Sequence, residues 1–431
     1  MRKSVEKFRK KFNTKFLNIF IFKLIEWEVK RMVTKRDPTA FFREEYERLV
    51  KEGLNWELRV LESASEPECI VDGRKVIMMC SNNYLNLATH PRVVQAMIEA
   101  AQKYGAGAGS DRSIAGNMLI HEELDRTLAR FKQAPASLTF QTGYMANEGL
   151  IPQLADKGDL FVSDELNHGS IIDGIRLSHA DRAIYKHKDV SDLERILNEA
   201  ERHDPPYKRI WIITDGVFSM DGDLAPLPEI VKLAEEHGAG VYVDDAHGEG
   251  VLGEGGRGIV SHFKLGRDQV HVEMGTFSKA FGVIGGHITG SEDLRRFAYN
   301  KARTWLLSGA MPPAVAAACK AAIEVLESNP QLVDKVWENR RYFMEEVEAL
   351  GFDTGNTETP IIPIMCGRSK TARDLADYLW KKGIFVLPIV YPMVPRDKAR
   401  IRVQVCAKHT REHLDMAIEA LKSGGKDLGL I

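Results

Sequence analysis

From residue 37 onward, short apolar segments alternate with longer segments whose apolar residues recur every three or four positions. Residues 120–131 show a helical face, with apolar side chains spaced by 4, 4 and 3. Pro228–His237 is also predicted to be a helix, because it opens at a proline and closes before a glycine. The predicted strands are Ser137–Phe140, Leu160–Val162, Ala183–Tyr185, Arg209–Thr214, Gly240–Asp244, Val270–Gly275 and Gly286–Thr289. This alternation predicts an α/β fold with a mostly parallel central sheet covered by helices.

The pattern changes on both sides of this region. Upstream, helices are predicted over Ala40–Lys51 and Pro91–Tyr104, with an extended stretch over Cys69–Met79 between them. After Pro313, long helices are followed by three predicted strands, Ile361–Met365, Phe385–Val390 and Arg400–Val405. We therefore expect four parts: a basic extension (1–36), an N-terminal arm (37–80), a large domain (81–313) and a smaller α+β C-terminal domain (314–431).

Composition narrows the class of protein. The chain of 431 residues is 44% hydrophobic and 28% charged, which excludes a disordered or fibrous protein. A net charge of −2 gives no global field that attracts nucleic acid or an anionic membrane. The five cysteines are scattered and never spaced C-x-x-C, so we expect reduced thiols in a cytoplasmic protein. No apolar run approaches the ~20 residues that a membrane span requires.

The first 36 residues differ from the rest, with 12 Lys and Arg against 3 Glu. Their apolar stretch, Phe16–Trp27, is short and interrupted by Lys23. One interpretation is an amphipathic helix at a membrane interface. We prefer the interpretation that Met32 is an internal start, so that residues 1–31 lie outside the natural protein. N-terminal sequencing would distinguish the two.

Ligands of open parallel sheets bind at the carboxyl ends of the strands. Four segments that follow predicted strands carry chemically specific side chains. The first, residues 273–282, contains Lys279 among glycines, hydroxyls and aromatic residues. Lys279 is either an ordinary solvated lysine or an amine that forms a Schiff base. The second role requires burial, which lowers the pKa of the amine from ~10.4 and leaves it nucleophilic.

The second segment is an apolar strand that ends at Asp244 and is followed by His247. Asp244 is either a structural cap or a carboxylate for a planar ligand. A carboxylate beside a pyridine nitrogen keeps that nitrogen protonated, which pyridoxal phosphate (PLP) requires as an electron sink. Because this segment lies some 30 residues before Lys279, each reading strengthens the other.

The third and fourth segments could complete such a site. Phe140–Asn147 passes from a strand through Gly143 into a helix, and helix N-termini bind phosphate. An ordinary strand–helix turn is the equal alternative. His168 also follows a strand; it either makes structural hydrogen bonds or stacks on a flat cofactor.

Other cofactor sites lack the required pattern. The glycine run at residues 105–109 follows a helix, whereas a dinucleotide fingerprint follows a strand. The sequence contains no G-x-x-x-x-G-K-[ST] motif. No His, Cys or carboxylate cluster has metal-ligand spacing, so we expect no metal.

The combined motifs resemble the PLP-dependent α-oxoamine synthases, in order and at family spacing from about residue 40 to the C-terminus. The matching segments are Ser81–Leu85, Leu166–Asp173, Thr214–Gly222, Val243–His247, Gly275–Lys279 and Arg400–Arg402. The resemblance implies a fold-type I PLP-dependent transferase that works as a homodimer with shared active sites. Within the family, Leu166–Gly174 and Thr214–Gly222 look closest to glycine C-acetyltransferase, also called 2-amino-3-ketobutyrate coenzyme A ligase.

The resemblance also implies roles for individual residues. Lys279 would hold PLP covalently, Asp244 would pair with the ring nitrogen, and His168 would stack on the ring. The remaining contacts it implies are His247 and Ser219 to the phenolic oxygen, Gly143, Tyr144 and Thr276 to the phosphate, and Asn82 and Arg402 to the amino-acid carboxylate. Ser308 would reach the phosphate of the neighbouring subunit, although the second hydroxyl usual beside it is missing. Asn86 replaces a family glycine near the substrate.

Three functions remain open at this stage. The first is condensation of glycine with acetyl-CoA to 2-amino-3-ketobutyrate and CoA, or its reverse in threonine breakdown. The second is the same chemistry on another donor and amino acid, such as a pimeloyl donor with alanine in 8-amino-7-oxononanoate synthase, or a long acyl chain with serine. The third, a non-catalytic partner subunit, is nearly excluded because such a subunit would not need Lys279.

Overall fold

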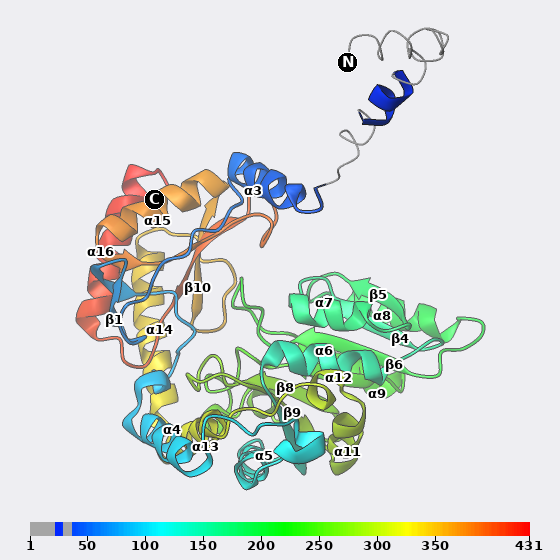
Figure 1. Ribbon diagram of the computed structural model, residues 1–431. Coiled ribbons are helices and arrows are strands. Elements are labelled where there is room, and N and C mark those ends of the chain that lie inside the picture. The colour runs from blue at the N-terminus through cyan, green and yellow to red at the C-terminus, as the bar shows by residue number, and fades with distance from the viewer. Residues whose placement is uncertain (1–21, 29–36) are drawn as a thin grey trace, which may run out of the picture. The chain divides into compact units, whose positions relative to one another are not determined.

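The structure, a computed structural model, describes residues 22–28 and 37–431 (Figure 1). The described residues divide into two units, one that ends at Leu58 and a compact one over Arg59–Ile431. In the first unit, residues 22–28 are helical, and α3 (Ala40–Glu52) ends at Gly53 in the left-handed region. The basic extension expected over residues 1–36 lies outside the described residues except for 22–28.

Seven strands form the central sheet of the second unit, in the order β3-β9-β8-β7-β6-β4-β5. Every strand runs in one direction except β9, which is antiparallel to both of its neighbours. Their bounds are β3 (Ala136–Phe140), β4 (Leu160–Asp164), β5 (Asp181–Tyr185), β6 (Ile210–Asp215), β7 (Gly240–Asp244), β8 (Val272–Thr276) and β9 (Gly286–Gly290). The predicted mostly parallel sheet is confirmed.

Helices cover both faces of this sheet, because parallel strands are joined by crossover connections. One face shares a core with α6 (Gly143–Leu154), α7 (Gly169–Arg176), α11 (Glu292–Lys301) and α12 (Arg303–Leu306). The other shares a core with α5 (Leu119–Phe131), α8 (Val190–Glu201), α9 (Leu227–Glu236) and α13 (Pro313–Ser328). Alternate residues of a strand face opposite sides. In β7, Tyr242 joins the first core, whereas Val241 and Val243 join the second.

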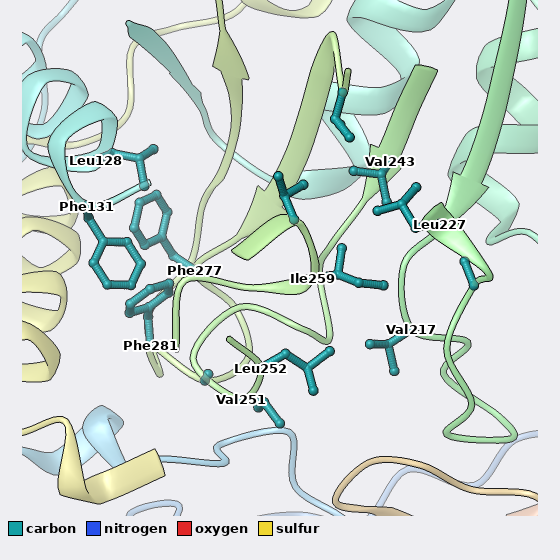
Figure 2. Close-up of a cluster of buried hydrophobic side chains, with 14 of the residues drawn as sticks. Leu128, Phe131, Val217, Leu227, Val243, Val251, Leu252, Ile259, Phe277 and Phe281 are labelled. Carbon is teal, nitrogen blue, oxygen red and sulfur yellow. The ribbon is translucent and has the colours of Figure 1, made fainter. Parts of the chain in front are cut away.

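Buried aromatic rings anchor the loop after β8. Phe277 and Phe281 pack on each other with ring centroids 5.4 Å apart, and Phe281 meets Phe131 of α5 edge-on at 6.0 Å. Figure 2 shows the three rings together, at one side of an aliphatic cluster that includes Val243. Because Phe277 and Phe281 are fully buried, the backbone on both sides of Lys279 is fixed.

A second core lies toward the C-terminus. Its helices are α14 (Gln331–Ala349), α15 (Ser369–Lys381) and α16 (Arg411–Asp427). Its sheet has the order β10-β13-β12, and a further sheet has the order β1-β2-β11. The strand bounds are β1 (Glu68–Val71), β2 (Arg74–Met78), β10 (Ile361–Gly367), β11 (Ile384–Phe385), β12 (Pro388–Ile389) and β13 (Ala399–Gln404). The predicted boundary at 313–314 stays a prediction; α13 belongs to the larger core and packs on α4 (Pro91–Tyr104) and α5.

The single strand predicted over Phe385–Val390 is wrong. The segment contributes β11 to one sheet and β12 to another. Pro388 opens β12, and proline cannot donate to a strand ladder, so it stands at a strand start rather than inside one. A short helix, α10 (Ile259–His262), lies between β7 and β8 in the chain.

None of the helices within residues 22–28 and 37–431 has both the length and the apolar character to cross a membrane. Over those same ranges, no group of three or more His, Cys, Asp or Glu side chains could hold a metal ion. All five cysteines are free thiols, and all except Cys80 are buried.

Candidate active site

A cavity of about 200 Å³ lies at the carboxyl ends of the parallel strands. Its walls come from the segments after β3, β4, β6, β7 and β8, as expected for this class of sheet. Eight of the predicted residues line it: Gly143, Tyr144, His168, Ser219, Asp244, His247, Thr276 and Lys279. The structure thus brings together side chains that are up to 136 positions apart in the sequence.

Lys279 is the amine of this cavity. Burial lowers its pKa from the usual 10.5 to about 8, although the negative charges of Asp244 and Asp215 oppose that change. An amine with this pKa is ~10% neutral at pH 7, against well under 0.1% for an exposed lysine. Lys279 is therefore suited to act as a nucleophile near neutral pH.

Asp244 is held in a fixed orientation. The Nδ2 group of Asn147 in α6 donates to Asp244 Oδ2 at 2.7 Å and to Ser170 Oγ at 2.8 Å. The Tyr242 hydroxyl donates to Asn147 Oδ1 at 2.6 Å. The other Asp244 oxygen, Oδ1, accepts from the Ala246 N–H at 3.1 Å. Asn147 lay within a motif singled out in the sequence, but its contact with Asp244 was not predicted.

Asp215 is a cavity residue that the sequence analysis missed. It is the Cα partner of Asp244 across the β6–β7 pair, and burial together with the charge of Asp244 raises its pKa well above 3.8. Its Oδ2 accepts from the His168 N–H at 2.9 Å. Its position directly before Gly216, at the end of an apolar strand, was the available signal. Burial also lowers the pKa of His168, so that its ring favours the neutral form.

A chain of hydrogen-bonded side chains links His247 to residues that are distant in the sequence. Its Nδ1 lies 2.9 Å from the Tyr84 hydroxyl. Gln404 Nε2 donates both to that hydroxyl, at 2.9 Å, and to Asn82 Oδ1, at 2.6 Å. Burial and the positive charge of Lys279 lower the pKa of His247 well below 6.5. Tyr84 and Gln404 were not predicted as site residues, because only folding brings them beside His247.

The N-terminus of α6 closes one end of the cavity. Thr142 caps the helix, with Oγ1 accepting from the Met145 N–H at 3.1 Å. A Cβ at Gly143 would lie 3.3 Å from Thr276 Cβ and Oγ1, so glycine permits a close approach to the end of β8. The first N–H groups of a helix have no intrahelical acceptor, and this end therefore suits an anion. The Thr276 hydroxyl donates to the Gly285 carbonyl at 2.7 Å.

Three predicted residues do not line this cavity. Asn82 Oδ1 accepts a hydrogen bond from Gln404 Nε2, and Arg402 Nη1 donates to the Ser219 carbonyl at 2.9 Å. Ser308 lines a separate small cavity with Arg112. The expected contact of Ser308 is with another subunit and stays a prediction.

A second buried charge cluster lies behind the cavity, on the other side of the β7 end. Lys132 Nζ is 2.7 Å from Glu273 Oε1, 2.8 Å from Glu249 Oε1 and 3.6 Å from Asp245 Oδ2. His287 Nε2 lies 2.8 Å from Glu249 Oε2. We call Lys132, Asp245, Glu249, Glu273 and His287 the Lys132 cluster. Asp245 also accepts from the Ile259 N–H at 2.9 Å, which fixes the turn after β7.

The donor set of the cavity fits PLP. A largely neutral buried amine (Lys279) can bind its aldehyde, and the oriented carboxylate of Asp244 can face its ring nitrogen. The α6 N-terminus beside Gly143 leaves room for its phosphate. These three groups are of different chemical kinds and all face one cavity.

Comparison with known proteins agrees with this geometry. Residues 74–421 match the family model described as aminotransferase class I and II. A protein named 8-amino-7-oxononanoate synthase from Thermoanaerobacter pseudethanolicus is 52% identical over 91% of this chain and 98% of its own length. One of the same name from Symbiobacterium thermophilum is 52% identical over 91% of this chain and 99% of its own. A serine palmitoyltransferase from S. paucimobilis with bound PLP superposes with a TM-score of 0.85 at 29% identity, over 91% of this chain and 98% of that one.

These comparisons confirm the predicted fold-type I transferase fold and the PLP cofactor. The narrower expectation of glycine C-acetyltransferase is not supported, since the relatives above carry the name that the sequence analysis gave as the alternative. The chain belongs to the PLP-dependent aminotransferase class I and II family and is an acyltransferase of the α-oxoamine synthase type.

Proposed function

We propose that this chain is an 8-amino-7-oxononanoate synthase, which joins alanine to a pimeloyl thioester of coenzyme A or acyl carrier protein. The observation that supports this most is 52% identity, over 91% of the chain, to proteins of that name. The product is a nine-carbon acid with a ketone at C7 and an amine at C8. Seven carbons come from the pimeloyl group and two from alanine, so the alanine carboxyl leaves as carbon dioxide and the thiol is released.

Several residues of the cavity hold the cofactor in this proposal. Lys279 would bind it covalently, and Gly143 and Tyr144 would offer backbone N–H groups to its phosphate, with Thr276 beside them. His168 would cover the ring, and His247 and Ser219 would contact the phenolic oxygen. When bound, PLP supplies an electron sink that stabilises negative charge on the α-carbon of the amino acid.

Asp244 and Lys279 then share the proton chemistry. Asp244 would keep the ring nitrogen protonated, and the 2.7 Å hydrogen bond from Asn147 holds Asp244 in orientation. The free amine of Lys279 would remove the α-proton of alanine. Its pKa of about 8 matches this task, since a general base works best with a pKa near the operating pH.

Arg402 and Asn82 bind the substrate carboxylate in this proposal. A guanidinium group is suited to a planar carboxylate, and the positive charge of Arg402 is one of the influences on the pKa of Lys279. In the structure, both side chains form hydrogen bonds within the chain, Arg402 with Ser219 and Asn82 with Gln404. Substrate binding therefore exchanges these contacts for contacts with the carboxylate.

We also propose that the enzyme acts as a homodimer. Two strongly exposed apolar side chains are Ile114, in the short helical segment Arg112–Gly116, and Leu307, directly after α12. Their two segments are linked by hydrogen bonds from Ser113 Oγ to the Leu306 carbonyl and from the Ala310 N–H to the Ser110 carbonyl. An exposed apolar patch of this kind marks an interaction surface. Light scattering should give twice the chain mass, and Leu307→Glu should shift the protein toward the monomer.

Substrate assays test the proposed reaction. Alanine, glycine and serine are each paired with pimeloyl-, acetyl- and palmitoyl-CoA, and Lys279→Ala provides the background. We expect the alanine–pimeloyl pair to have the highest kcat/KM, by about tenfold or more. Preference for glycine with acetyl-CoA would instead support glycine C-acetyltransferase, the function first expected from the sequence. Borohydride reduction followed by peptide mass spectrometry should place the pyridoxyl label on Lys279.

A further inference from the structure

A second and larger cavity, of about 470 Å³, adjoins the first. The two share Ser219, so a ligand could extend from one to the other. Its walls come from the segments after β4 and β6 on one side, and from β10 and the segment before β13 on the other. Its size is within the range of roughly 300–1,000 Å³ that is usual for small-molecule sites.

Part of the wall of this second cavity is apolar and adaptable. This part includes Leu166 and Phe218 together with three methionines, Met220, Met365 and Met393, whereas polar and charged side chains line the remainder. Methionine side chains are flexible and fit irregular or changing shapes. Such walls suit a chain of methylene groups better than a rigid planar ligand.

The carboxylates in this cavity already have partners. Glu165 accepts from the His187 N–H at 2.9 Å. Asp223 lies 3.0 Å from His187 Nε2 and 3.2 Å from Lys188 Nζ. Asp221 is paired with the buried guanidinium of Arg400. These acidic groups therefore need no cation from a ligand, and Arg400 is not available for an anion.

Lys398 differs from the other charged groups of the cavity. Its backbone is fixed, with the N–H donating to the Pro395 carbonyl at 3.2 Å and the carbonyl accepting from Arg400 Nε at 3.1 Å. Across the described ranges, 22–28 and 37–431, no hydrogen bond or ion pair involves its ammonium group. The cavity thus combines a partly apolar wall, charged groups that are already paired, and the exposed ammonium group of Lys398.

We infer that the second cavity binds the acyl chain of the donor and that Lys398 binds a carboxylate at the far end of that chain. This inference rests on the proposed function and assigns the donor class as a thioester of a dicarboxylic acid. The methylene groups lie among Met220, Met365 and Met393, and the thioester carbon enters the first cavity past Ser219. An acetyl group would leave both the apolar walls and Lys398 without a partner.

Two donors that differ in a single group test the inference. Pimeloyl-CoA and heptanoyl-CoA have equal chain length and the same coenzyme A phosphates, but only the first ends in a carboxylate. In Lys398→Met we expect kcat/KM for pimeloyl-CoA to fall by about tenfold or more, with heptanoyl-CoA within about twofold of the unmodified enzyme. Lys398→Arg should retain most of the pimeloyl activity. Lys157→Met, which removes an exposed lysine elsewhere, is the matched control.

Two results would overturn the inference. An equal fall with both donors would mean that Lys398 binds a phosphate of coenzyme A, and no change with either donor would mean that it binds neither anion. Calorimetry of the holoenzyme with free pimelate and heptanoate separates this question from the proposed function. If no donor is turned over, the proposed function fails, yet tighter binding of pimelate that is lost in Lys398→Met still supports the inference. If pimelate binds no better than heptanoate, the inference fails even if turnover is confirmed.

Discussion

Two buried charge clusters meet at the end of β7, and they differ in how their charges are balanced. The cavity cluster comprises Lys279, Asp244, Asp215, His168 and His247. The Lys132 cluster lies on the other side of the strand end. Asp244 and Asp245 are consecutive residues, one in each cluster, because successive residues at a strand end face opposite sides of the sheet.

The two lysines show the effect of this difference. Burial acts to lower the pKa of both. At Lys132 the carboxylates of Glu249, Glu273 and Asp245 outweigh burial and raise the pKa above its usual value, so the amine stays charged. At Lys279 the nearby carboxylates are too weak to do so, and the pKa falls to about 8. Burial alone therefore does not make a reactive lysine; incomplete charge compensation does.

Removing the reactive amine should have the largest effect. In Lys279→Ala, all turnover above background should disappear, and hydride reduction should leave no pyridoxyl label on the chain, because no amine remains to hold the aldehyde. Circular dichroism and thermal unfolding should show a folded protein. Retention of near-normal turnover would contradict the role proposed for Lys279.

Removing the amine of the other cluster should mainly affect stability. Lys132→Met leaves three buried carboxylates near one another without their shared cation, and should lower the free energy of unfolding by about 3–5 kcal/mol. Urea titration measures the loss. The double variant Lys132→Met/Asp245→Asn should recover part of it, since Glu273 still pairs with Arg267 and Glu249 with His287, whereas Asp245 loses its cation. Additive losses in the double variant would indicate that the two side chains are not coupled.

The adjacent aspartates should separate catalysis from stability. Asp244→Asn should lower kcat by roughly a hundredfold or more through loss of the charge facing the ring nitrogen, with little change in Tm. Asp245→Asn should lower Tm, and kcat should fall much less. Steady-state kinetics and calorimetry on both variants test this. Equal effects of the two substitutions on kcat and on Tm would contradict the distinction between a catalytic and a structural cluster.

The pH dependence of Lys279 should give the smallest effect. Its folded-state pKa, about 8, lies below the unfolded value of 10.5, so the neutral amine forms as the pH rises through 8. In the apoenzyme, the rate at which an amine-reactive probe labels Lys279 should rise about tenfold per pH unit below 8 and then level off. Exposed Lys157 should continue to gain reactivity toward pH 10. Peptide mass spectrometry compares the two in one sample.

The sequence was sufficient to predict the site residues that lie at or directly after the ends of strands. Lys279, Asp244, His168 and His247 each follow a short apolar segment that proved to be a strand, so the rule for parallel sheets located them. Asp215 is the last residue of a strand and is followed by Gly216, which was a signal, but the sequence does not show its partner. Its pairing with Asp244 is visible only in the folded sheet.

Contacts between distant segments could not be predicted. Tyr84 reaches His247 across 163 positions, and Gln404 reaches Tyr84 across 320. The Lys132 cluster combines Lys132, which directly follows α5, with residues of β8, β9 and the turn after β7; Asp245 and Glu273 lie in motif segments, but their contact with Lys132 was not predicted. The environment of Asn86, which replaces a glycine usual in the family, was also not predicted. Its backbone has a positive φ of 55°, and its side chain forms hydrogen bonds with Glu66 and Thr89.

The second cavity, which we infer to bind the acyl chain, has walls from both hydrophobic cores. Phe218 belongs to the larger core, whereas Met365 lies on β10, between residues of the smaller one. The length of chain that fits is therefore set by the spacing between these two cores as much as by any side chain. Directed evolution toward shorter or longer donors should accordingly select changes where the two cores meet, and in residues 391–398, alongside substitutions at the methionines themselves.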